Sequence, residues 1–193
     1  MEEINIIKRY FKRVMIIIFS IIIYSLLVIL IMNKFILDKP YYKNSDFKIK
    51  NIYSKVDYNK NNIDDYSDIL LGARKLVGKN TKEIELLSKS FKYAGYNILS
   101  MIGEDTSIKG INKYFVNNTY RLTNNIKVID KYNYGDIIIY DEGLGIVSDK
   151  RNKEGISFLI YVKNGIVVEE DIMPKLKIIG HYRFDATLID NLK

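Results

Sequence analysis

The feature that most constrains this chain is a run of nineteen residues without a charge, residues 14–32, close to the N-terminus. As an α-helix rising about 1.5 Å per residue, the run is about 28 Å long, close to the ~30 Å hydrocarbon core of a bilayer. A helix of this length buried in a globular protein would show a polar stripe, and this run has none. The run therefore predicts a transmembrane helix.

The residues just before the apolar run indicate its orientation. Under the positive-inside rule a basic cluster stays cytoplasmic, so residues 33–193 are expected outside. A cleaved signal peptide is the alternative, but its apolar core is about 7–15 residues long and a small-x-small cleavage site should follow, which is missing here. We expect a cytoplasmic leader (1–13), an uncleaved signal anchor (14–32) and a single-pass protein of the cell membrane. The basic residues of the leader are Lys8, Arg9, Lys12 and Arg13.

Residues 33–62 are rich in Lys, Asn, Asp and Tyr. They have no sustained apolar periodicity, which is typical of a solvated polar stalk. Contact of the lysines with anionic lipid head groups or wall polymer is the alternative. A folded domain is expected to follow over residues 63–193.

The first part of this domain has helical periodicity. Apolar residues recur every three or four positions over residues 66–77, which predicts an amphipathic helix. A second helix is expected after Asn80 as N-cap, with Glu83 completing a capping box and Gly95 following the helix end. A third is expected over residues 107–116.

Beyond residue 121 the pattern changes to that of β-strands, and Asn164-Gly165 favours a type I′ hairpin turn. Helices followed by an antiparallel meander indicate an α+β domain. The strands are expected at residues 126–129, 136–140, 144–148, 156–163, 166–170 and 177–184.

The chain has no cysteine and a single histidine, His181. These counts exclude disulfide bonds, thiolate metal sites, a cysteine nucleophile and a multi-histidine metal site built from this chain alone. An oxygen-only site could draw on Asp136, Asp141, Glu142 and Asp149, but these lack the D-x-D-x-D-G spacing of a calcium loop. We therefore expect no metal and no cofactor.

The net charge of +7 is spread thinly along the chain, and no nucleic-acid-reading motif accompanies it. An exterior location also argues against such a partner. We expect no binding to nucleic acid.

Several short motifs in the second half carry a family resemblance. The stretch GDIIIY at residues 135–140, followed by GLGIVSD at 143–149, resembles the core of NlpC-type papain-like hydrolases. With FKYAGY at 91–96, EEDI at 169–172 and GHYRF at 180–184, the set is similar to the bacterial family called domain of unknown function 1287. The resemblance covers roughly residues 63–185.

The resemblance implies a papain-like half-barrel, in which a helix presents a nucleophilic cysteine at its N-terminus and a histidine on the sheet acts as base. A helix N-terminus lowers the pKa of a thiol, and a neighbouring imidazole completes the activated nucleophile. The implied activity is hydrolysis of amide bonds, with peptides of the cell wall as the expected substrate class.

This chain departs from the family pattern at each catalytic position. Counting back from the AGY motif places Glu83 at the cysteine position and Glu85 at the aspartate that follows it. Gly143 stands at the position of the base, and Lys163 is near a second family histidine. Cysteine catalysis is therefore excluded, and these four positions are interpreted as degenerate.

His181 is the one remaining candidate base, and a satisfied core or sheet-edge histidine is the simpler interpretation. Glu83 and Glu85 project about 200° apart on a helix, so they do not form a natural acid–base pair. If the ancestral cleft survives as a ligand groove, its residues would be Glu83, Glu85, Gly143, Leu144, His181 and Arg183.

Together these observations predict a membrane-anchored, extracytoplasmic and catalytically inactive relative of a papain-like amidase or peptidase. It would act as a binding or scaffolding module at the cell envelope, with the lipid bilayer, cell-wall peptide or an envelope protein as partners. Two alternatives stay open: a cell-wall peptide hydrolase using non-cysteine chemistry at Glu83 or Glu85 with His181, and a structural subunit of a membrane complex.

Overall fold

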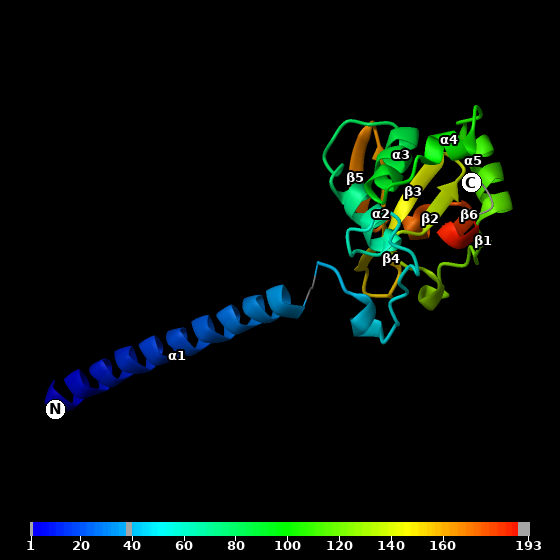
Figure 1. Ribbon diagram of the computed structural model, residues 1–193. Helices are drawn as coiled ribbons and strands as arrows, with labels where there is room; N and C mark the ends of the chain where they lie inside the picture. The colour runs from blue at the N-terminus through cyan, green and yellow to red at the C-terminus, as the bar shows by residue number, and fades with distance from the viewer. Residues whose placement is uncertain (1, 38–39, 189–193) are drawn as a thin grey trace. The chain divides into compact units, whose positions relative to one another are not determined.

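The computed structural model describes residues 2–37 and 40–188 of the chain (Figure 1). It divides into two compact units, Met1–Pro40 and Tyr41–Lys193, which are described one at a time.

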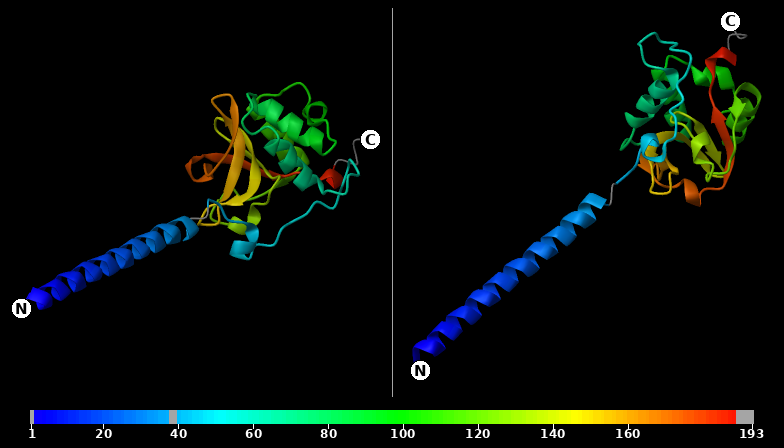
Figure 2. Two further views of the ribbon diagram at one scale, coloured as in Figure 1. Left: turned by 90° about the vertical axis from the view of Figure 1, so that its left-hand side faces the viewer. Right: turned by 90° about the horizontal axis from the view of Figure 1, so that it is seen from below.

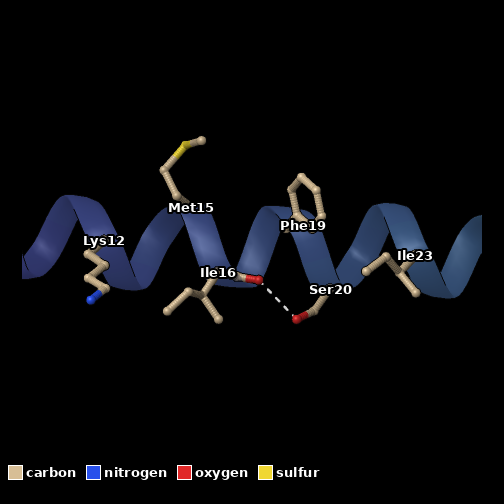
Figure 3. A pocket seen from close by; sticks show the side chains of 6 residues that line it. All are labelled: Lys12, Met15, Ile16, Phe19, Ser20 and Ile23. Atoms are coloured by element: carbon tan, nitrogen blue, oxygen red, sulfur yellow. Dashed lines mark hydrogen bonds between the residues drawn. The ribbon is translucent and has the colours of Figure 1, made fainter.

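The first unit is the helix α1 (Glu2–Leu37), and its stretch Arg9–Ile31 is long and apolar enough to cross a membrane. The expected apolar helix is therefore confirmed. Its two serine hydroxyl groups bond to the helix itself: Ser20 donates to the carbonyl of Ile16 at 2.9 Å and Ser25 to that of Ile22 at 2.8 Å. Figure 3 shows the first of these bonds beside a shallow open depression along the helix. Because the hydroxyls are satisfied internally, neither needs water or a partner helix.

The second unit is built on a six-stranded antiparallel sheet of order β1-β6-β2-β3-β4-β5, curved like an open half-barrel (Figure 2). Helices precede nearly all of it in the chain, so the α+β class is confirmed. Asn164 and Gly165 have φ of +52° and +78°, as a type I′ turn requires, and join β4 to β5 as expected. The strands are β1 (Tyr120–Arg121), β2 (Ile137–Tyr140), β3 (Gly143–Arg151), β4 (Ser157–Lys163), β5 (Ile166–Glu170) and β6 (Ile178–Arg183).

Four α-helices gather on one side of this sheet, as the left view of Figure 2 shows. Asp64 caps the first of them by accepting from the backbone N–H groups of Tyr66 and Ser67, and Ser107 caps the last. The helices are α2 (Asp65–Arg74), α3 (Glu83–Tyr93), α4 (Ile98–Ile102) and α5 (Ile108–Asn118). Short 3₁₀ turns are η1 (Asn44–Phe47), η2 (Ile129–Lys131), η3 (Met173–Lys175) and η4 (Ala186–Leu188).

The expected start of α3 is wrong. The N-cap is Lys82, which makes no side-chain capping bond, and Glu83 is the first helical residue rather than a capping-box partner. Asn80 instead pairs with Ile166 at the edge of β5, because the backbone before α3 continues the sheet there. Gly95 follows the helix with φ of +91°, as expected.

The sheet carries one apolar core on each face because successive side chains alternate. Ile137, Ile139 and Leu144 belong to the core that packs against the helices. Ile138 and Tyr140 belong to the second core, which 3₁₀ turns and loops cover. The expected strand at residues 126–129 is absent, since Ile126 and Ile129, three positions apart, both pack against this second core beside a 3₁₀ turn.

The compact unit begins at Tyr41 rather than at residue 63, where the sequence suggested the end of a stalk. Tyr42 and Arg151 exchange two backbone hydrogen bonds of 2.8 Å. The Arg151 side chain is 1% exposed and bonds the side chain of Asn44. It also donates to the carbonyls of Gly155 and Tyr132, both at 2.6 Å. Burial lowers the pKa of Arg151 to about 10. The backbone bonds with Tyr42 and the side-chain bond to Asn44 tie residues 41–44 to the sheet.

Candidate functional site

Two residues of the expected groove, Glu83 and Gly143, lie near one buried phenol, that of Tyr140. Gly143 opens β3 directly opposite Tyr140 in the β2–β3 register. A Cβ atom at Gly143 would stand 2.9 Å from the Tyr140 hydroxyl oxygen. Tyr140 is 7% exposed, and burial, together with the charges of Glu83 and Glu142, raises its pKa to about 12. The space into which a base at position 143 would project is therefore filled by a neutral tyrosine.

Lys163, near the second expected histidine position, belongs to an ion pair beside this phenol. Its Nζ lies 2.9 Å from Glu170 Oε2, which also accepts from the Tyr161 hydroxyl at 3.0 Å. The Tyr161 ring meets the Tyr140 ring edge to face at 6.5 Å between centroids. The hydrogen bond from Lys163 holds the pKa of Glu170 below its ordinary value. These contacts close the surface of β4 next to Tyr140.

Glu85 is engaged on the surface of α3. It accepts from Thr81 Oγ1 at 2.9 Å and from Lys89 Nζ at 2.8 Å, one helical turn further on. The bonds from Lys89 and Thr81 lower the pKa of Glu85. The group is therefore an anion at neutral pH and a poor proton donor.

His181 is fully buried on β6, and both of its ring nitrogens face acceptors. Nδ1 lies 2.8 Å from the carbonyl oxygen of Thr123, which can only accept, so Nδ1 carries a proton. Nε2 lies 3.0 Å from Asp136 Oδ2. The Tyr132 ring stacks on the imidazole at 4.1 Å. Because the imidazole is fully buried and both of its ring nitrogens are engaged, it cannot contact a substrate at the surface.

Arg183 completes this network and is itself mostly buried, with 13% of its side chain exposed. Its Nε and Nη2 donate to the two carboxylate oxygens of Asp136, each at 2.7 Å. The backbone N–H of Asn133 adds a bond of 2.8 Å. These contacts join the GD motif before β2 to the GHYR motif on β6.

The structure divides the six residues of the expected groove between different places. Leu144 is fully buried in the core that faces the helices. His181 pairs with Ile138 and lies on the opposite face of the sheet. Alternation along the strands therefore places Leu144 and His181 on opposite faces of the sheet. Glu83, at the start of α3, and Gly143 both lie near Tyr140.

A second polar network, not anticipated from the sequence, joins α2 to β3 and β5. Arg74 Nη2 lies 2.8 Å from Glu169 Oε1 and also contacts Asp149. Ser148 Oγ donates to Glu169 at 2.5 Å, and Lys150 Nζ donates to the same carboxylate at 2.6 Å. Burial alone would raise the pKa of Glu169, but the bonds from Lys150, Ser148 and Arg74 lower it below its ordinary value. The sequence signal for this network was the presence of charged residues in the strand segments IVSD (146–149) and EED (169–171).

Among the described residues, no three His, Cys, Asp or Glu side chains converge in the arrangement of a metal site. The loop of residues 57–68, which mixes carboxylate, amide and backbone oxygens, is considered below.

The motif residues of both networks lie within one family match. The family model described as Domain of unknown function (DUF1287) matches residues 86–184, just over half of the chain. No curated protein matches the chain, and no solved structure matches it either. Asp136, Ser148, Glu169 and His181 all fall inside the matched range, whereas Glu83 and Glu85 precede it. The chain therefore belongs to the DUF1287 family of domains of unknown function.

Proposed function

We propose that this protein is a membrane-anchored, extracytoplasmic binding module of the cell envelope that recognises a ligand without cleaving it. The observation that carries the proposal is the phenol of Tyr140, whose hydroxyl occupies the space into which a side chain at Gly143 would project. A papain-like site needs a thiolate and an imidazole in contact. The chain contains no cysteine, and His181 is buried and engaged through both ring nitrogens.

The charged pairs that hold the scaffold together support a binding role. The Asp136–Arg183 pair ties β2 to β6, and the Arg74–Glu169 pair ties α2 to β5. A fixed framework of this kind can present a recognition surface after catalysis is lost.

The surface around the start of α3 favours a charged peptide as ligand. Glu83, Glu142 and the exposed Lys82 lie at or near this end of the sheet, two of them close enough to Tyr140 to raise its pKa. Such groups suit the amines and carboxylates of cell-wall peptides, which is the class that the papain-like resemblance implies. An envelope protein is the second candidate partner.

The stretch Arg9–Ile31 would hold the domain at the bilayer. The basic leader would keep the N-terminus in the cytoplasm and place residues 41–193 outside, by the positive-inside rule.

The test uses the full chain in detergent micelles with purified cell-wall fragments, measuring both bound fragment and newly released amino groups. Saturable binding without release of amino groups is expected. Glu83→Gln should weaken binding, whereas the exposed control Glu154→Gln should not.

Two outcomes would contradict the proposal. Turnover that is lost in Glu83→Gln or in folded His181→Ala protein would indicate a hydrolase with non-cysteine chemistry. No binding and no turnover, with cellular function lost when α1 is exchanged for an unrelated apolar helix, would indicate a structural subunit of a membrane complex.

A further inference from the structure

The loop that leads into α2 has the ligand spacing of an EF-hand calcium loop. Such a loop has twelve residues, with oxygen ligands at positions 1, 3, 5, 7, 9 and 12, and its last residues begin a helix. Residues 57–68 are twelve residues long, and α2 begins at Asp65, the ninth of them. The side chains at positions 1, 3, 5, 9 and 12 are Asp57, Asn59, Asn61, Asp65 and Asp68. Asparagine replaces aspartate at positions 3 and 5 and replaces glycine at position 6, which is why the D-x-D-x-D-G pattern missed the loop. Position 12, normally a bidentate glutamate, is Asp68.

The backbone follows the same scheme. Position 6 of a calcium loop is normally glycine because the chain turns sharply there, and Asn62 at this position has φ of +69°. The Asp57 carboxylate accepts the backbone N–H groups of Asn61 at 3.1 Å and Asn62 at 2.7 Å. Asn61 Oδ1 accepts the N–H of Ile63 at 2.8 Å. The loop therefore wraps around its own side-chain oxygens.

Independently of the loop's shape, a buried carboxylate points into it without a counter-charge. Asp68 is 0% exposed. Its carboxylate oxygens accept hydrogen bonds from the side-chain amide of Asn59 at 2.7 Å and from that of Asn61 at 3.0 and 3.2 Å. Both asparagines belong to the loop itself. Among the side chains that the structure describes, those of residues 9–31 and 40–188, no Lys, Arg or His nitrogen forms an ion pair with Asp57, Asp65 or Asp68. A buried charge left without a partner of opposite sign is costly.

Asp65 adds to this negative charge. It is 1% exposed and accepts from the Tyr96 hydroxyl at 2.6 Å and the backbone N–H of Tyr58 at 3.0 Å.

We propose that residues 57–68 bind one Ca²⁺ ion through the side chains of Asp57, Asn59, Asn61 and Asp68 and the backbone carbonyl of Ile63. Asp65 would contribute as position 9 does in such loops, often through a water molecule. An asparagine amide carries an oxygen and an NH₂ group on one plane, so rotation of Asn59 and Asn61 replaces the donors with acceptors. Ca²⁺ is favoured over Mg²⁺ because it accepts six to eight oxygens in flexible geometry.

The ion would fasten residues 41–62 to the helices. The Tyr58 ring stacks on Tyr96 at 4.5 Å, and Asn59 Nδ2 donates to the carbonyl of Tyr93 at 2.9 Å. This inference does not depend on the proposed function.

The first measurement is Tb³⁺ luminescence excited through tyrosine, on chelator-treated full chain in detergent micelles. Tyr58 lies in the loop and Tyr96 contacts it, so both act as sensitisers. Emission should saturate at one ion per chain and be displaced by about 1 mM Ca²⁺ but not by equal Mg²⁺. Calorimetric titration with Ca²⁺ alone gives the affinity directly.

Asp57→Asn should weaken Ca²⁺ binding about tenfold or more because it removes one ligand charge. The control Asp130→Asn makes the same change at an exposed carboxylate outside the loop and should bind as the wild type does. Asn61→Asp, which adds a charge at position 5, should bind Ca²⁺ more tightly and keeps the proposal testable if Asp57→Asn does not fold. Absence of both emission and heat in folded wild-type chain would overturn the proposal. So would an unchanged affinity in folded Asp57→Asn or in Asn61→Asp.

Discussion

Arg183 on β6 holds both carboxylate oxygens of Asp136, with its Nε and Nη2 each 2.7 Å from one of them. Asp136 precedes β2, which is the neighbour of β6 in the sheet. His181 approaches the same carboxylate from the buried side, with Nε2 at 3.0 Å. Two motifs that are 45 residues apart in the sequence are thus parts of one charged network.

Asp136→Asn should therefore destabilise the domain. The change leaves the Arg183 guanidinium without its anion, and removal of one partner of a buried pair costs about 3–5 kcal/mol. Chemical denaturation followed by circular dichroism measures the loss, with the exposed change Asp130→Asn as control. A loss equal to that of the control would show that the network does not stabilise the fold.

The sequence predicted the strands from residue 136 onward well because local features define them. Alternating apolar residues mark both faces, and Asn164-Gly165 determines the β4–β5 turn, so that β5 was expected at the residues where it is found. The two-residue strand β1 and the short helix α4 were missed because neither is long enough to show a period.

Features that depend on contacts distant in sequence could not be predicted. Asn44 and Arg151 are 107 residues apart, and their contact draws a segment expected to be a stalk onto the domain. Glu83 and Gly143 were expected near one another from the family register, but the Tyr140 phenol that fills the space at Gly143 depends on side-chain packing. The register of β6, likewise, decides that His181 faces away from Leu144.

Gly143→Ala should destabilise the domain because the new Cβ atom would stand 2.9 Å from the Tyr140 hydroxyl. Overpacking of this kind costs about 1–3 kcal/mol. Tyr140→Phe removes the nearest atom, so the double variant should recover much of the loss in a double-mutant cycle. Additive effects of the two changes would mean that the phenol does not fill this space.

Glu169 makes stability depend on pH in the acidic range. Its pKa in the folded protein lies below its ordinary value because the bonds from Lys150, Ser148 and Arg74 outweigh burial. The contribution of Glu169 to the free energy of unfolding is therefore fully present above its ordinary pKa. It is lost as pH falls through the lower pKa that the group has in the folded protein. Glu169→Gln should flatten the fall in unfolding free energy between about pH 5 and pH 3. Glu154→Gln, at an exposed site, should leave that slope unchanged, and an unchanged slope in Glu169→Gln would contradict the assignment.

The absence of cysteine makes the orientation of α1 testable by single-cysteine labelling without any background substitution. Tyr10→Cys reports on the leader end of the helix, where Tyr10 is 71% exposed, and Lys153→Cys reports on an exposed loop of the domain. Because the basic cluster is expected to stay in the cytoplasm, a membrane-impermeant maleimide should label Lys153→Cys in intact cells. It should label Tyr10→Cys only after the cells are permeabilised. Labelling of Tyr10→Cys alone in intact cells would reverse the topology and remove the envelope as the place where this domain acts.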